Sequence, residues 1–243
     1  MANEIFFYLY SKLISNPKMT PLEILFLDLK DVKVIDSTIP SSQYTPLDLS
    51  DANLELNHLN SSDATEFEAY IEKLLAKNNA LVAYGGYNEV RSLYKRSVVF
   101  NDSNTEERNI HIGLDLWIKA GTPVLAALDG KVHSFQFNNN LGDYGPTIIL
   151  EHQLEDQIFY TLYGHLSLES IVSLNVGDFF AKGQQLATLG DATVNGDYAP
   201  HLHFQIIKNI EENFGDYPGV CSKNKLEYYL ENCPDPNLLL KIY

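Results

Sequence analysis

The chain has 243 residues, of which 45% are hydrophobic, so it can form one large domain or two small ones around a sizeable core. It carries 17 Lys and Arg against 32 Asp and Glu, a formal net charge of −15. This acidic balance argues against nucleic acid and anionic membrane surfaces as partners, because binding to both depends on clustered cations. No stretch reaches the ~18–20 apolar residues that a membrane span requires.

The amino terminus lacks the pattern of a secretory leader. Glu4 lies where a leader carries cations, and the apolar run that follows ends at Lys12. We therefore expect a cytoplasmic protein, or a periplasmic or extracellular one if a leader has been removed. Cys221 and Cys233 are too far apart for a Cys-x-x-Cys motif, and we expect both to be reduced thiols.

Residues 1–80 are predicted to form an N-terminal extension with short helices. Proline and capping residues mark the helix ends, and apolar residues at helical spacing mark the faces that pack. One β-branched run indicates a strand within this extension. The predicted elements are helices at 3–15, 20–29 and 62–77, a strand at 32–35 and a loop at 37–50.

Residues 81–210 are predicted to form a β core. After Arg108, short alternating apolar runs are separated by Gly and Pro, a pattern typical of an antiparallel β-sheet sandwich or barrel. Asp129-Gly130 lies between two such runs and predicts a hairpin. The fold class is therefore mainly β, or α+β overall when the flanking helices are included. The predicted strands are 110–118, 123–127, 130–137, 147–151, 158–163, 185–189 and 201–207.

Residues 211–243 are predicted to be a C-terminal tail that packs on the core. A short helix is expected at 223–231, and Leu238-Leu239-Leu240 is too apolar to remain free.

A second feature outside the strands is the basic cluster of Arg91, Lys95 and Arg96. It could hold a carboxylate or phosphate group, but pairing with neighbouring acidic residues is the expected role.

Two histidines share one face of the last predicted strand. In Pro200-His201-Leu202-His203-Phe204 successive side chains alternate, so His201 and His203 point one way while Leu202 and Phe204 point into a core. Such a pair can give one imidazole to a metal and leave the other free beside it. By itself the pair is more often a structural feature.

His111 and Asp115 supply what that pair lacks. They are four residues apart, so on a strand they share a face with Gly113 between them. Two His and one Asp from two strands would hold Zn²⁺ at three corners and leave the fourth for water, as in catalytic zinc sites. Between these two segments in the sequence, His165 adds a further imidazole.

Residues 108–207 resemble the lysostaphin-type zinc metallopeptidases, the LytM-like endopeptidases. Six motifs occur in the order and spacing of that family. They are His111-x-x-x-Asp115, Ala120-Gly121-Thr122-Pro123-Val124, Tyr163-x-His165-Leu166-Ser167, Val176-Gly177-Asp178, Lys182-Gly183-Gln184 and Pro200-His201-Leu202-His203-Phe204. The resemblance implies a mostly antiparallel metallopeptidase core with a groove across one sheet.

The resemblance also implies the site residues and the reaction. His111, Asp115 and His203 would be the ligands of Zn²⁺, the one cofactor expected, and His165 and His201 would be the catalytic pair. The expected activity is zinc-dependent hydrolysis of peptide bonds, and peptidoglycan cross-links are the family's typical substrate. His201 could move the proton, and His165 could orient water or stabilise the oxyanion, with the division between them left open.

Two features distinguish this chain from typical family members, which are secreted or periplasmic: it shows no leader and is strongly acidic. Segments 84–91, 142–146 and 233–238 resemble a branch in which such a domain is joined to kinase-like and aminotransferase-like domains in intracellular proteins. Kinase-like or aminotransferase-like partner proteins are therefore a further expectation. The alternative function is a non-peptidase intracellular binding or carrier module whose histidines pass on phosphate. Asp115 argues against it, because a carboxylate repels phosphate and suits a cation.

Overall fold

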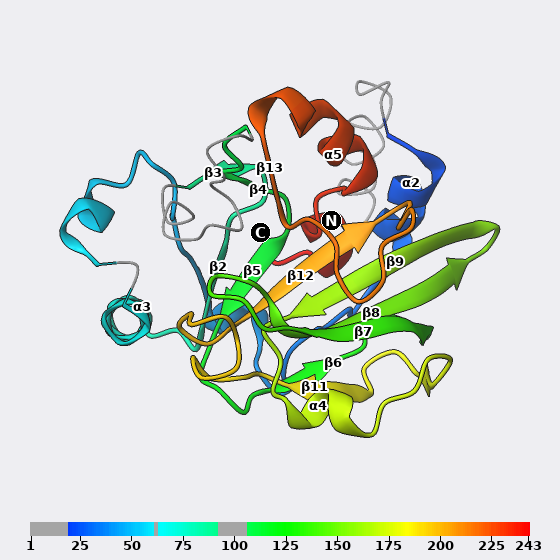
Figure 1. The fold of residues 1–243 in the computed structure, drawn as a ribbon, viewed down its shortest axis with the longest axis horizontal. Coiled ribbons are helices and arrows are strands. Elements are labelled where there is room, and N and C mark those ends of the chain that lie inside the picture. The colour runs from blue at the N-terminus through cyan, green and yellow to red at the C-terminus, as the bar shows by residue number, and fades with distance from the viewer. Residues whose placement is uncertain (1–18, 61–62, 92–105) are drawn as a thin grey trace, which may run out of the picture.

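An eight-stranded sheet forms the centre of the chain, in a computed structural model that describes residues 19–60, 63–91 and 106–243 (Figure 1). The strand order is β1-β2-β5-β12-β9-β8-β7-β10, and every neighbouring pair is antiparallel except β1 with β2. The mainly β fold predicted from the sequence is confirmed. Its strands are β1 (Tyr44–Pro46), β2 (Val82–Gly85), β5 (Leu114–Trp117), β7 (Gly130–Asn138), β8 (Gly145–Leu154), β9 (Gln157–Gly164), β10 (Phe179–Phe180) and β12 (His201–Ile207).

Two small sheets flank the large one. One pairs β6 (Pro123–Leu125) with β11 (Gln185–Thr188), and the other has the order β13 (Val220–Cys221), β4 (Ile110–His111), β3 (Glu89–Val90). The hairpin predicted at Asp129-Gly130 is wrong, because β6 pairs with β11 while β7 pairs with β8 and β10. A turn signal is local, whereas the pairing of β6 with β11 buries Val124 and Ala187 in the main core.

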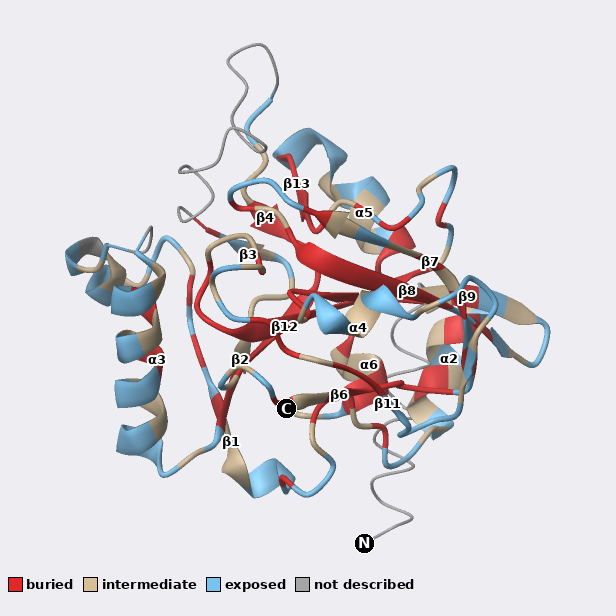
Figure 2. Cartoon of the chain, turned by 60° about the horizontal axis from the view of Figure 1, so that its bottom comes forward, coloured by how far each residue is buried: buried red, intermediate tan, exposed pale blue. Residues whose placement is uncertain are grey.

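The strand pattern of β12 determines which side chains reach the core. Leu202, Phe204 and Ile206 are fully buried in the main hydrophobic cluster, as their alternation predicts. Figure 2 shows buried residues along the central strands and exposed ones on the outer face of the long helix α3 (Ala64–Asn78). The main cluster therefore packs on one face of the large sheet, and a second cluster that includes Ile149, Leu162 and Ile207 packs on the other face.

The N-terminal elements follow their capping signals. Thr20 forms a capping box with Glu23 at the start of α2 (Pro21–Asp28), and Asp63 accepts hydrogen bonds from two backbone amides at the start of α3. Both helices were predicted. The predicted strand at 32–35 is only a single bridge from Ile35, and the predicted loop 37–50 contains β1 and the 3₁₀ turn η1 (Ser41–Gln43). The helix predicted at 3–15 lies outside the described residues.

The C-terminal residues form short helices that pack on the core. The 3₁₀ turn η4 (Lys223–Lys225) leads into α5 (Leu226–Asn232), and Leu239 and Leu240 of α6 (Asn237–Leu240) are buried in the main cluster, so the predicted docking is confirmed. The remaining short helices are η2 (Leu54–His58) and α4 (Glu169–Val172). Both cysteines are buried free thiols. Within the described residues, no helix is long and apolar enough to span a membrane.

Candidate metal centre

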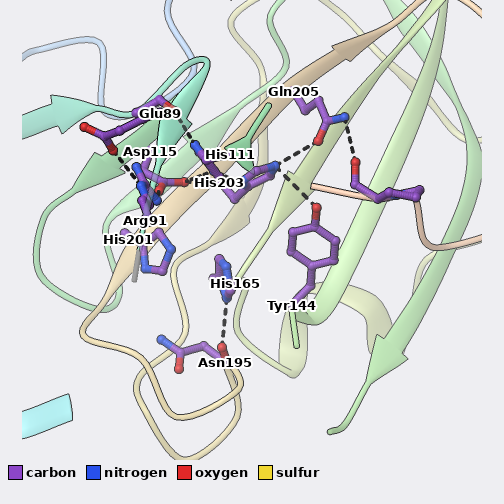
Figure 3. Close-up of polar contacts among 12 residues, drawn as sticks. Glu89, Arg91, His111, Asp115, Tyr144, His165, Asn195, His201, His203 and Gln205 are labelled. Carbon is purple, nitrogen blue, oxygen red and sulfur yellow. Dashed lines mark hydrogen bonds and ion pairs between the residues drawn. The ribbon is translucent and has the colours of Figure 1, made fainter. Parts of the chain in front are cut away.

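Three buried side chains converge beside the large sheet (Figure 3). His111 Nε2 lies 2.9 Å from His203 Nδ1 and 3.3 Å from Asp115 Oδ1, and His203 Nδ1 lies 3.1 Å from the same carboxylate oxygen. All three residues are at most 3% exposed. Two imidazole nitrogens and one carboxylate oxygen therefore form a compact triangle.

Three different strands bring these donors together. His203 of β12 is directly opposite Asp115 of β5 in the large sheet, whereas His111 belongs to β4 of a small sheet. The predicted continuous strand 110–118 is wrong, since it is interrupted at Ile112-Gly113 between β4 and β5. The turn of the chain there, and not a common strand face, brings His111 and Asp115 within contact.

The hydrogen bonds on the outer side of each ring determine which nitrogens carry lone pairs. His111 donates from Nδ1 to the carbonyl oxygen of Gly86 at 2.8 Å, so its Nε2 is the acceptor. His203 Nε2 lies 3.0 Å from Oε1 of Gln205, whose amide nitrogen donates to Pro218 O at 3.1 Å. His203 Nδ1 therefore also presents a lone pair toward the centre of the triangle.

This donor set fits a metal ion. His111 Nε2 and His203 Nδ1 lie 2.9 Å apart with their lone pairs facing each other and a carboxylate oxygen beside them. Such groups repel one another unless a cation lies between them. A zinc ion about 2.1 Å from each donor in tetrahedral geometry would separate the donors by roughly 3.4 Å. The observed separations of 2.9–3.3 Å are slightly shorter than that value, so the three donors need to move apart only a little to hold the ion.

The protonation states agree with metal binding. Burial, followed by the charge of Arg91, lowers the pKa of His111 to about 4. Burial by itself would raise the pKa of Asp115, but His111 and Arg91 outweigh it and hold that pKa well below its usual value. A neutral imidazole and an ionised carboxylate are the forms that coordinate a metal.

Two further imidazoles lie beside the triangle. The rings of His165 and His201 are 4.1 Å apart between centroids, and His165 lies 6.4 Å from His203 on the same measure. Each donates Nδ1–H to a backbone carbonyl at 2.8 Å, His165 to Asn195 and His201 to Ala199. Their Nε2 atoms are thus free to accept a proton.

Burial keeps both of these imidazoles neutral. It lowers the pKa of His201 to about 4, and burial together with the neighbouring His201 holds the pKa of His165 well below its usual value. His165 directly follows β9 with a left-handed backbone, φ +63°, which turns its ring toward β12. All five residues predicted for the site lie along one cleft.

Aromatic side chains form the walls of this cleft. The Trp117 indole stacks on the His201 ring, with centroids 3.9 Å apart and planes 16° apart. Tyr144, Tyr198 and Tyr217 also line the cleft. The Tyr144 hydroxyl lies 3.4 Å from His203 Nε2 and donates to the Tyr217 carbonyl at 3.2 Å.

Sequence reasoning missed several residues that hold the site. Gln205 follows His203 by two residues on β12, and that spacing, which puts both side chains on one strand face, could have indicated the hydrogen bond between them. The Asn195 carbonyl bonded to His165 carries no sequence signal. Arg91 pairs with acids, as expected for the basic cluster, but one partner is Asp115, 24 residues away. Lys95 and Arg96 lie outside the described residues.

Two neutral imidazoles beside a buried triangle of two imidazoles and a carboxylate form an arrangement that could hold one metal ion and place proton acceptors next to it. Comparison with known proteins adds a family match. Residues 109–213 match the model of peptidase family M23, and this segment is referred to below as the M23 domain.

Relatives of this domain include a metalloprotease and a peptidoglycan endopeptidase. An uncharacterized metalloprotease of Haemophilus influenzae is 35% identical over 95 residues, 39% of this chain and 18% of the relative. Peptidoglycan DD-endopeptidase ShyC of Vibrio cholerae is 31% identical over 106 residues, 43% of this chain and 22% of the relative. The catalytic domain of lysostaphin from Staphylococcus simulans superposes with a TM-score of 0.36 and 27% identity, covering 50% of this chain and 80% of that one. The chain spans about a fifth of the length of these two curated relatives.

Proposed function

We propose that this chain is a zinc-dependent endopeptidase that hydrolyses peptide bonds, with peptidoglycan cross-link peptides as the first substrate class to test. The observation that carries the proposal is the triangle of His111, Asp115 and His203, whose donor atoms lie 2.9–3.3 Å from one another in a buried site. The name of the Vibrio cholerae relative supports the substrate class. The relatives support a peptide-directed reaction and give no support to the kinase-like or aminotransferase-like partners.

His111, Asp115 and His203 would hold the zinc ion. When bound there, zinc would lower the pKa of water from ~15.7 to about 7 and polarise the scissile carbonyl. The hydrogen bonds from His111 to Gly86 and from His203 to Gln205 fix the ring orientations, so both rings already face the position of the ion.

His201 and His165 would handle the proton. Each is neutral, and each has its Nδ1–H tied to a backbone carbonyl, so Nε2 is the atom that accepts a proton from water and returns it to the leaving amine nitrogen. The stack with Trp117 holds His201 in the cleft. We propose His201 as the proton carrier and His165 as the group that orients water or stabilises the oxyanion.

The phosphate-carrier alternative is not favoured. The Asp115 carboxylate lies 3.1 Å from His203 and 3.3 Å from His111, which would repel a phosphoryl group on either ring. The cytoplasmic location predicted from the sequence stays a prediction.

A panel of short glycine, D-alanyl and ordinary L-peptides, scored by mass spectrometry, tests the proposal. Cleavage should disappear when the metal is chelated and return with zinc. His201→Ala should lose at least 10²-fold in hydrolysis while binding zinc like the parent, and His203→Ala should lose both. His133→Ala is the matched control, since His133 lies on β7 and bonds to Ser134 outside the cleft. A purified protein that neither contains zinc nor takes it up would contradict the proposal.

A further inference from the structure

Two buried ion pairs that share Arg91, those with Glu89 and with Asp115, lie next to the metal centre and are called the relay below. Arg91 Nη1 donates to Asp115 Oδ2 at 2.6 Å, and Arg91 Nε donates to Glu89 Oε2 at 2.6 Å. The side chains of Arg91 and Asp115 are each 2% exposed, and that of Glu89 is 14% exposed. One guanidinium therefore joins two carboxylates, of which Asp115 belongs to the metal triangle (Figure 3).

The backbone around Arg91 holds this relay in place. Arg91 directly follows β3, whose Glu89 is paired with His111 of β4, and the Arg91 amide donates to the Asn109 carbonyl at 2.8 Å. Glu89 is fixed in turn, because its Oε1 accepts a hydrogen bond from the Leu49 amide at 3.1 Å. Arg91, Glu89 and Leu49 lie before the M23 domain of residues 109–213, whereas Asn109 and His111 belong to it, so the guanidinium is anchored from both sides of the boundary.

Gly86 leaves the space that the guanidinium fills. A Cβ built at Gly86 would lie 1.7 Å from Arg91 Nη2 and 2.9 Å from His111 Nδ1. Its φ of +105° is also a conformation that glycine adopts readily. The carbonyl of the same residue accepts the Nδ1–H of His111. One glycine therefore accommodates Arg91 and orients His111.

We infer that Arg91 is a positioning residue for the metal ligand Asp115. By holding Oδ2, it leaves Oδ1 as the single carboxylate oxygen that faces His111 and His203. Glu89, Arg91 and Asp115 together carry one net negative charge, so the relay presents the ion with the charge of one carboxylate. This inference rests on the proposed zinc site and adds a residue from outside the M23 domain to it.

The geometric and electrostatic effects of Arg91 on zinc affinity have opposite signs. A buried cation next to the site repels a metal ion, so its removal by charge alone would strengthen zinc binding. Loss of the hydrogen bond to Oδ2 frees Asp115 to rotate and to offer both oxygens, which weakens a preformed three-donor site. Outer partners of metal ligands typically contribute 10–100-fold in affinity. We therefore expect the geometric effect to dominate.

Two substitutions separate these effects. Arg91→Met keeps the aliphatic stem and removes both the charge and the hydrogen bonds, whereas Arg91→Lys keeps the charge and cannot bridge two carboxylates with a rigid fork. Lys208→Met is the matched control, because it removes a partly buried ion pair with Glu23, at 3.0 Å, on another part of the chain. Glu89→Gln is a milder fourth variant, which loosens the guanidinium without removing it.

Zinc affinity is measured by competition with a chelator, and coordination is followed by the visible spectrum of the cobalt(II)-substituted protein. We expect 10–100-fold weaker zinc binding in Arg91→Met and Arg91→Lys, a several-fold effect in Glu89→Gln and no change in Lys208→Met. The cobalt absorption should lose intensity in both Arg91 variants, because a second Asp115 oxygen raises the coordination number.

Unchanged zinc binding in the Arg91 variants would overturn the inference. If Arg91→Met binds zinc as tightly as the parent or more tightly, with an unchanged cobalt spectrum, Arg91 does not position Asp115. If Arg91→Met does not fold, Arg91→Lys and Glu89→Gln decide by the same two readouts. A parent protein that binds no metal refutes the proposed function and this inference together. A parent that binds metal alongside unaffected variants refutes only the role of Arg91.

Discussion

Gly113 separates β4 from β5, and adding one methyl group there tests the geometry of the whole centre. A Cβ built at Gly113 would lie 2.4 Å from His203 Cε1 and 2.6 Å from His203 Nε2, with the Phe204 carbonyl at 3.1 Å. Ordinary contact begins near 3.4 Å, so the imidazole of His203 must move by about 1 Å. Nε2 of that ring is also held by Gln205 at 3.0 Å, so a shift of the ring strains this hydrogen bond as well.

The expected effect of Gly113→Ala on function is large. A shift of about 1 Å exceeds the tolerance of about 0.5 Å within which a catalytic constellation works, and it can cost about 10²-fold in rate. Zinc affinity should fall at least tenfold, because His203 Nδ1 leaves the triangle. Overpacking at a buried position should also lower the free energy of unfolding by about 1–3 kcal/mol.

Gly177→Ala is the control for that loss of stability. Gly177 has φ +91° and no atom within 4 Å of a built Cβ, so alanine there strains the backbone by about 1–3 kcal/mol without touching the site. The assays are chelator competition for zinc affinity, peptide hydrolysis, and thermal unfolding of both variants. Gly113→Ala with zinc affinity and hydrolysis equal to those of Gly177→Ala would refute the geometry of His203 described above.

Two further predictions concern stability. Free zinc at about 1,000 times its dissociation constant should stabilise the fold by about 4 kcal/mol. The melting temperature measured by calorimetry should then rise by about 8–16 °C. An unchanged melting temperature would contradict the metal site. Burial lowers the pKa of His152 from 6.5 to about 4. As the pH falls, the unfolded chain therefore takes up the proton at a higher pH than the folded chain does. The free energy of unfolding should decrease between about pH 6.5 and pH 4, by at most about 3 kcal/mol. His152→Leu, measured by urea unfolding without zinc, should be less stable than the parent at pH 7 by an amount that shrinks toward pH 4; a constant difference would contradict this assignment.

The local rules of secondary structure made part of the fold predictable. Period-two alternation correctly predicted that Leu202 and Phe204 enter the core while His201 and His203 face the cleft. Capping residues correctly predicted where α2 and α3 begin. These features depend on residues a few positions apart, whose interactions are the same in most folds.

Pairing between distant segments was not predictable in this way. Asp129-Gly130 has the local chemistry of a hairpin, yet β6 pairs with β11, about 60 residues further along the chain, because that pairing buries apolar side chains. Similarly, His111 and Asp115 were predicted to share a strand, but the strand is interrupted at Ile112-Gly113, and the two residues lie in different sheets. The expected proximity was correct while its cause was different.

The sequence by itself determined which chemical groups are available: four imidazoles and one carboxylate in an order that resembles one peptidase family. Only the tertiary structure decided that His111, Asp115 and His203 lie within 3.3 Å of one another, that Gly86 and Gln205 fix the lone pairs, and that Arg91 holds the outer carboxylate oxygen. Residue type and short-range spacing are properties of a segment. Distances between segments depend on how the whole chain packs, because each strand finds its neighbours through the core that they bury together.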